Sequence, residues 1–161
     1  MPHDRKTAIR QDLADAQHAL LMELDRIGPD DWSRVSPYEG WTLRNLLTHL
    51  TTSEVAFGPT LRRMAAGQGG VPADFDPNRW NASQLRRRGE VDAAALRAEL
   101  EAAHADMLTL LETLDDTALD HRGYLSTGIE GNTEDNFRLV ASHKRDHTKD
   151  IRAALENRIK A

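Results

Sequence analysis

Two histidines near the end of the chain are spaced so that they could bind one metal ion together. His143 and His147 lie four residues apart in a segment with the period of a long helix, so their side chains share one helix face. His147 falls within the apolar stripe of that segment and His143 at its edge. A buried imidazole must be hydrogen-bonded or ligated, because leaving it unsatisfied costs roughly 1 to 3 kcal/mol.

His49 is the best candidate for a partner, because it lies on an earlier predicted helix, just beyond the edge of that helix's apolar face. Three neutral imidazoles that converge between helices form a site for a divalent ion, with zinc or nickel suited to nitrogen ligands. The chain has no cysteine, which excludes thiolate ligands, disulfides and a cysteine nucleophile. We expect metal affinity to decrease as the pH drops below the imidazole pKa, which is near 6.5 when unperturbed. The alternative is that the histidines are hydrogen-bonded core residues without a metal.

Acidic side chains near these histidines are candidates for catalytic or supporting roles. Glu54 lies within the apolar arc of the helix that carries His49, which is unusual for a carboxylate unless it is paired or reaches water along its own methylene groups. Glu54 or Asp146 could act as a catalytic base. Asp150, three residues after His147, could orient an imidazole by accepting its second N–H.

Residues 67–90 form a connection that is longer than the usual 4 to 6 residues or so and rich in Gly, Pro, Asp and Asn. Trp80 and Asn81 could cover a pocket there and contact a bound cofactor. Residues 86–88, all arginine, could meet an anionic substrate, although an exposed arginine run is more often simply solvated. We leave His104 out of the metal site, since a half-covered histidine at a helix edge is the more frequent case.

Four segments have the apolar period of amphipathic helices, and no segment has the alternation typical of strands. They span residues 4–27, 42–64, 92–114 and 133–159. Gly28 and Pro29 end the first helix, whereas Thr42, Asp92 and Thr133 are the expected N-caps of the others. The predicted inward residues are Ile9, Leu13, Ala16, Leu20, Leu24 and Ile27; Leu43, Leu46, Leu47, Leu50, Phe57, Leu61 and Met64; Leu96, Leu100, Ala103, Met107, Leu110, Leu111 and Leu114; and Phe137, Val140, Ile151, Ala154 and Leu155.

Four such stripes can be buried economically only against one another, which predicts an all-α protein with a four-helix bundle. The connections over residues 67–90 and 115–132 are long enough to cross the bundle, so we expect at least one long crossover connection, with irregular structure or only short helices in both. Metal sites in bundles are built from inward side chains of facing helices. That is the geometry expected for the three histidines.

Composition limits the classes of function. The 161 residues are expected to form one domain, residues 1–161. The formal net charge of -5 gives no electrostatic reason to expect binding to nucleic acid. No run of 18 apolar residues and no N-terminal apolar segment after the first charges is present, so we expect a cytoplasmic protein that does not enter a membrane.

The order and spacing of several motifs together resemble the DinB/YfiT-like superfamily. The matching motifs are Gly40-Trp41-Thr42, Leu46-Leu-Thr-His49-Leu50, the loop Phe75-Asp-Pro-Asn-Arg-Trp80-Asn81, and His143-Lys-Arg-Asp-His147. The resemblance covers nearly the whole chain. It implies a four-helix bundle in which one histidine of the second long helix and two of the fourth bind a divalent metal, here His49, His143 and His147.

The resemblance also implies a small-molecule substrate. Members of the superfamily include hydrolases and thiol-dependent S-transferases and isomerases that use bacillithiol or mycothiol, and the second connection commonly lines their pocket. We therefore expect a metal-dependent hydrolase or an S-transferase that uses a low-molecular-weight thiol; the alternative is a non-catalytic, stress-associated binding protein with a structural metal or none. A homodimer is also expected, because apolar residues such as Leu21 lie off the main stripes.

Overall fold

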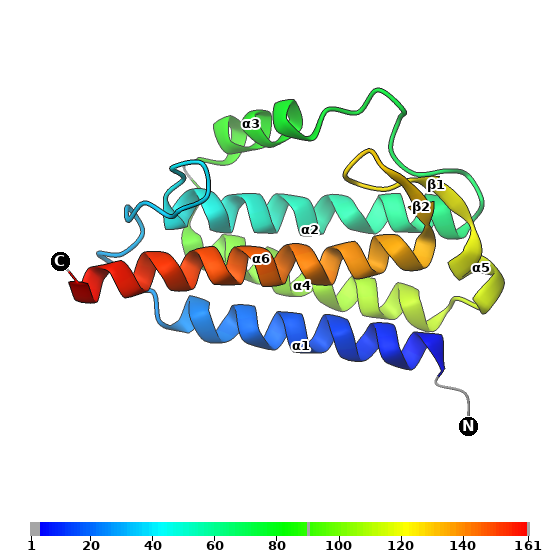
Figure 1. The fold of residues 1–161 in the computed structure, drawn as a ribbon, viewed down its shortest axis with the longest axis horizontal. Helices are drawn as coiled ribbons and strands as arrows, with labels where there is room; N and C mark the ends of the chain where they lie inside the picture. Colours follow the sequence, from blue (N-terminus) through cyan, green and yellow to red (C-terminus); the bar gives the residue numbers. More distant parts are fainter. Residues whose placement is uncertain (1–3, 90, 161) are drawn as a thin grey trace.

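The chain folds around four long helices that lie side by side (Figure 1). The computed structural model describes residues 4–89 and 91–160, with side chains up to residue 157. The long helices are α1 (Arg5–Asp25), α2 (Leu43–Ala65), α4 (Ala93–Glu112) and α6 (Thr133–Lys160). The prediction of an all-α bundle is confirmed, and each helix boundary lies within about two residues of the expected one.

The order of packing differs from the order along the chain. Helix α6 packs against α1 and α2, and α2 also packs against α4. Helices α2 and α4 run in one direction and α1 and α6 in the other (Figure 1). Because α2 and α4 are neighbours with the same direction, the chain between them must return along the length of the bundle. This segment, residues 66–92, is the predicted long crossover.

The predicted apolar stripes form the core, which divides into two clusters. Nearly all the expected inward residues are buried; Ala103, Leu110, Leu114 and Ile27 are partly exposed. One cluster contains Ile9, Leu13, Ala16, Phe57, Leu61, Met107, Leu111, Leu119, Phe137, Val140 and Ala141. The other contains Leu20, Leu24, Leu43, Leu46, Leu47, Leu50, Leu96, Leu100, Ile151, Ala154 and Leu155.

A buried polar layer separates the two clusters and joins all four long helices. Its centre is Lys144 of α6, whose side chain is fully buried. Lys144 Nζ donates hydrogen bonds to Gln17 Oε1 of α1 at 2.8 Å and to His104 Nδ1 of α4 at 2.9 Å. It also lies 2.5 Å from Glu54 Oε1 of α2. Of the two alternatives considered for Glu54, the structure shows the paired carboxylate rather than one that reaches water. His104 belongs to the same polar layer.

The two long connections carry more regular structure than the sequence indicated. Helix α3 (Pro77–Arg88) lies within the crossover, and α5 (Asp116–Asp120) precedes a two-stranded antiparallel hairpin of β1 (Arg122–Tyr124) and β2 (Glu130–Asn132). The expectation that strands are absent is wrong here, because strands of three residues are too short to produce a detectable alternation. A Cβ at Gly70 would lie 1.8 Å from the Tyr124 carbonyl oxygen, so only glycine fits where the crossover passes the hairpin.

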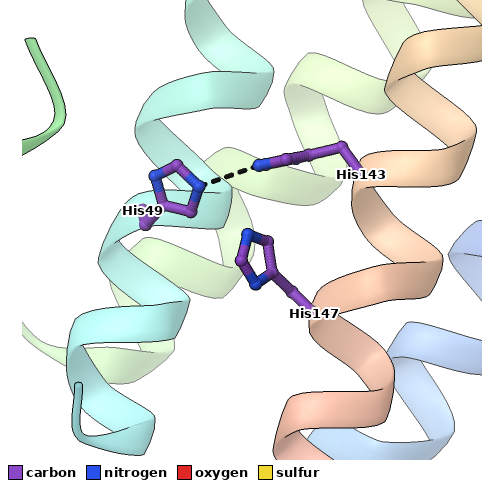
Figure 2. Close-up of side chains that lie close together, drawn as sticks. All are labelled: His49, His143 and His147. Atoms are coloured by element: carbon purple, nitrogen blue, oxygen red, sulfur yellow. Dashed lines mark hydrogen bonds between the residues drawn. The ribbon is translucent and has the colours of Figure 1, made fainter. Parts of the chain in front are cut away.

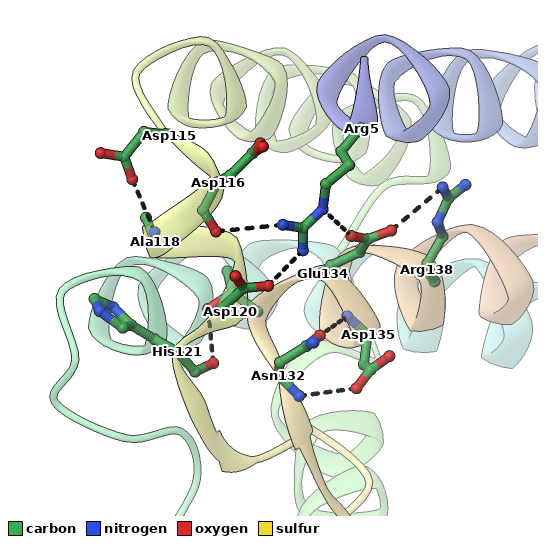
Figure 3. Close-up of polar contacts among 11 residues, drawn as sticks. Arg5, Asp115, Asp116, Ala118, Asp120, His121, Asn132, Glu134, Asp135 and Arg138 are labelled. Carbon is green, nitrogen blue, oxygen red and sulfur yellow. Dashed lines mark hydrogen bonds and ion pairs between the residues drawn. The ribbon is translucent and has the colours of Figure 1, made fainter. Parts of the chain in front are cut away.

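Helix caps follow the expected chemistry with one shift in register. Thr42 and Asn45 form the predicted capping box of α2. At α6 the N-cap is Asn132 rather than Thr133: Asn132 Oδ1 accepts from the Asp135 backbone N–H, and Asp135 Oδ2 accepts from that of Asn132 (Figure 3). Thr133 instead donates its hydroxyl to the His121 carbonyl oxygen and anchors the hairpin to the helix.

Two surface predictions concern exposure. His18 is exposed, as expected. Leu21 is partly buried against the core of its own chain, and the homodimer stays a prediction. None of the helices in the described part of the chain has the length and apolar character needed to cross a membrane.

The polar layer gives a stability prediction. Lys144→Met should lower the free energy of unfolding by about 3 to 5 kcal/mol, because it leaves the Glu54 carboxylate buried without its counter-ion. The double variant Glu54→Gln/Lys144→Met should recover at least half of that loss, since the buried charge is then gone. Urea unfolding followed by circular dichroism measures both. A double variant no more stable than the single one would contradict the ion-pair explanation.

Candidate metal centre

The three predicted histidines come together between α2 and α6. His49 extends from α2 and His143 and His147 from adjacent turns of α6, with the three rings pointing toward one another (Figure 2). His49 Nε2 and His143 Nε2 are 2.8 Å apart, and one ligand atom from each of the three residues lies within 4.8 Å of the other two. Among the described residues, no cysteine or carboxylate joins this cluster.

The cluster fits a divalent ion in donor type and spacing. Tetrahedral nitrogen ligands at 2.0 to 2.1 Å from an ion are about 3.4 Å from one another. This value lies between the 2.8 Å separation of His49 and His143 and the 4.8 Å limit of the whole cluster, so the spacing of the three nitrogens is compatible with one ion. Three neutral imidazoles leave at least one coordination position without a protein ligand, which is typical of catalytic rather than structural zinc.

Burial keeps the three imidazoles neutral, the form that binds metals. It lowers the pKa of His49 to about 3, with a further lowering from the positive charge that His147 would carry. The pKa of His143 is likewise held well below its usual 6.5, first by burial and then by His49 and His147. For His147 burial also lowers the pKa, and its hydrogen bond with Asp150 partly offsets the effect.

Asp150 orients one of the three rings. His147 Nδ1 lies 3.0 Å from Asp150 Oδ2, so Nδ1 carries the proton and Nε2 is free to face the other imidazoles. The two candidate bases lie elsewhere: Glu54 is turned toward Lys144, and Asp146 is exposed on α6. Neither lines the cavity next to the histidines.

Aromatic side chains from the connection before α2 enclose the histidines. The Tyr38 ring centroid is 4.7 Å from that of His147, and the Trp41 centroid is 5.3 Å from that of His49. A tight turn holds both: the Ser36 N–H donates to the Trp41 carbonyl oxygen at 2.7 Å, and Gly40 has a φ of 73° that suits glycine. Sequence reasoning missed Tyr38 as a site residue, although aromatic residues are concentrated in this connection.

A cavity of about 520 Å³ opens beside the metal centre. The three histidines and Tyr38 line one part of it. Trp80 and Asn81 of α3 line another, and their contact with a bound cofactor stays a prediction. Residues 86–88 do not line it, and Arg88 instead pairs with Glu99 at 2.7 Å. The cavity is large enough for a small molecule and reaches the nitrogen ligands directly.

Solved structures with the same fold include proteins of known and unknown activity. YfiT from Bacillus subtilis, described as a probable metal-dependent hydrolase with an unusual four-helix bundle topology, aligns with a TM-score of 0.79 and 21% identity over 99% of this chain and 90% of its own. A mycothiol-dependent maleylpyruvate isomerase aligns with a TM-score of 0.73 and 18% identity over 95% of this chain and 62% of its own. An uncharacterised protein from Escherichia coli UTI89 aligns with a TM-score of 0.77 and 15% identity, over 95% of this chain and 94% of its own.

At these identities the structural matches establish the fold alone. No curated protein sequence matches the chain significantly. The family assignment comes from a sequence model described as the DinB superfamily, which matches residues 12–151 and so includes α2, most of α6 and all three histidines. The resemblance found in the sequence motifs is therefore confirmed, and the chain belongs to the DinB superfamily.

Proposed function

We propose that this protein is a metal-dependent enzyme in which His49, His143 and His147 hold one divalent ion, zinc or nickel, and act on a small molecule in the adjacent cavity. The observation that carries the proposal is the position of three neutral imidazoles on the wall of a cavity of about 520 Å³. A metal held there would supply Lewis-acid activation of a bound water or thiol at neutral pH.

The surroundings favour thiol transfer over hydrolysis. Hydrolysis benefits from a carboxylate base close to the attacking water. Among the residues that the structure describes, no Asp or Glu lines the cavity. Glu54 lies outside the cavity and is paired with Lys144. A low-molecular-weight thiol is a much stronger acid than water, so on binding a metal it would release its proton to solvent without a carboxylate base. The mycothiol-dependent maleylpyruvate isomerase, which has the same fold, supports this choice. We therefore place S-transfer first and hydrolysis second.

The chain's own groups would prepare the site. Asp150 fixes the His147 ring so that Nε2 faces the cavity. Tyr38 and Trp41 pack against His147 and His49 and limit the access of water. Burial raises the pKa of Tyr38, so its phenol stays protonated and can donate a hydrogen bond to a developing negative charge on the substrate.

The alternative is a non-catalytic binding protein in which a metal only ties α2 to α6. A structural zinc site is normally closed by four protein ligands. Here the described residues supply three, and the open side faces the cavity. This arrangement favours the enzyme, and measured turnover of a thiol-dependent or hydrolytic substrate would decide between the two.

Metal binding can be tested with single variants. Untagged protein should bind one Zn²⁺ or Ni²⁺ per chain, and His49→Ala and His147→Ala should each lose most of the affinity, because two imidazoles hold an ion much more weakly than three. His18→Ala is the matched control, since His18 is exposed on α1. Isothermal titration of metal-free protein measures all four. Equal affinity in wild type and in both site variants would refute the three-histidine centre.

The support from Asp150 can be tested separately. Asp150→Ala should weaken metal binding about tenfold or more while leaving the fold intact, because His147 loses the acceptor that fixes its ring. Asp146→Ala removes an exposed carboxylate from the same helix and should have a much smaller effect. Competition with a chromophoric chelator gives the affinities. Equal losses in the two variants would assign the effect to charge rather than to ring orientation.

The lowered pKa values set the pH dependence of metal binding. Protons compete with a metal only at a pH low enough to protonate the imidazoles of the folded, metal-free site. Burial lowers the pKa of these imidazoles below the usual 6.5, so the competition begins at a lower pH. Affinity should therefore fall less as the pH drops through 6.5 than it would for ordinary imidazoles, and the main loss should come at lower pH. The value of 6.5 expected from sequence applies to an unperturbed imidazole, and burial of these rings lowers it. Titration in a series of buffers checks it; a steep loss that begins at 6.5 would contradict the pKa assignment.

A further inference from the structure

The cavity beside the metal centre has an uneven charge. Among the described residues that line the cavity, Arg63 is the one side chain that is charged at neutral pH. These lining residues include no carboxylate. The opposite face of α2 differs: there Arg62 lines a second cavity together with Glu54, Glu99 and Asp106. Arg63 therefore lies at a cavity without acidic side chains, whereas the neighbouring Arg62 lies at a cavity whose acidic side chains balance its positive charge.

Arg63 has no acidic partner in the described part of the chain. Most arginines that contact other elements do have one, as in the pairs Arg5 with Glu134 and Arg145 with Asp12. The one hydrogen bond of the Arg63 side chain runs from Nη2 to Thr60 Oγ1 at 3.3 Å. A guanidinium has five N–H donors, so most of its capacity is available to a ligand.

The distance along α2 between Arg63 and the histidines sets the length of a ligand that could reach both. Cavity-lining residues of α2 recur along one helix face from His49 through Ser53 and Phe57 to Thr60. The contact with Thr60 shows that the Arg63 side chain turns back along the helix toward the histidines. Thr60 is eleven residues beyond His49, which corresponds to about 16 Å along the helix axis at 1.5 Å per residue.

The cavity wall between these ends is largely apolar, and the far end offers another polar group. Ala56, Phe57 and Leu139 line the middle. Ser126, which follows β1, also lines the cavity, and its hydroxyl is buried without a hydrogen-bond partner among the described residues. The hairpin carrying it is fixed beside the end of α2, where His121 Nδ1 contacts the Ala65 carbonyl oxygen at 2.7 Å.

We propose that Arg63 forms a carboxylate-binding subsite at the end of the cavity opposite the histidines. The ligand is an elongated small molecule with one carboxylate at one end, an apolar middle, and the reacting group near the histidines. A single arginine matches one negative charge and can bind both carboxylate oxygens in a bidentate pair, whereas a phosphate brings a charge of about -1.5 to -2. The inference rests on the proposed function only for the identity of the reacting end.

The subsite can be tested without a metal. Titration of metal-free protein with octanoate and with 1-octanol should show at least tenfold tighter binding of octanoate, as expected for a hydrogen-bonded charge pair. Arg63→Gln should abolish that preference and Arg63→Lys should retain part of it, because lysine keeps the charge but not the bidentate geometry. Arg62→Gln is the matched control and should behave as wild type, since it lines the other cavity.

Two outcomes would overturn the proposal. One is an octanoate preference that is absent in wild type or unchanged by Arg63→Gln. The other is tighter binding of octyl phosphate than of octanoate, which would assign the subsite to phosphate rather than carboxylate.

A second titration separates this proposal from the metal centre. Zn²⁺-loaded protein should bind 11-mercaptoundecanoate more tightly than 11-mercaptoundecan-1-ol, and Arg63→Gln should remove the difference without changing the zinc stoichiometry. Loss of zinc binding with an intact octanoate preference would refute the proposed function but support the subsite. Normal zinc binding without any effect of Arg63→Gln would refute the subsite alone.

Discussion

The buried ion pair between Lys144 and Glu54 is the constraint on which the arrangement of the bundle depends. Both side chains are almost completely removed from water, and such charges persist only when they meet with good geometry. Gln17 and His104 supply the other partners of the ammonium group, so each of the four long helices contributes one residue. Apolar stripes alone would allow helices to slide past one another; this polar layer penalises any register in which the lysine lacks its carboxylate.

That register also determines the metal centre. Lys144 directly follows His143, and Glu54 lies five residues beyond His49, so the ion pair and the histidines occupy neighbouring turns of the same two helices. When α2 and α6 are aligned by the pair, His49 faces His143 and His147 (Figure 2). The layer and the histidine cluster are nevertheless separate: Glu54 faces α4, whereas the imidazoles face the cavity.

The long crossover gives the metal centre its cavity. Because α2 and α4 are parallel neighbours, residues 66–92 must return over one side of the bundle, and α3 lies there (Figure 1). None of the residues of α3 is buried, so this helix contributes little to the core. Its side chains Trp80 and Asn81 instead form part of the cavity wall.

Much of the fold was present in the sequence as a local pattern. Periodic apolar residues such as Leu13, Leu47 and Phe137 predicted the helices and their buried faces, because the 3.6-residue period is a property of the chain itself. The i, i+4 spacing of His143 and His147 predicted two ligands for the same reason. Even His49 could be proposed, from its place beside an apolar face.

The tertiary structure decided the features that join distant segments. Lys144 has no sequence signal of its own, since a lysine on a helix is normally solvated; its burial follows only once Glu54, Gln17 and His104 converge. The short hairpin forms because it packs beside the end of α2, not because its three-residue strands favour it. Arg63 is exposed in the folded chain, and only the fold places a cavity without carboxylates beside it. The helical period depends only on neighbouring residues, so it can be recognised in the sequence. Charge pairs and cavities form between residues that are far apart in the sequence, so they depend on the tertiary structure.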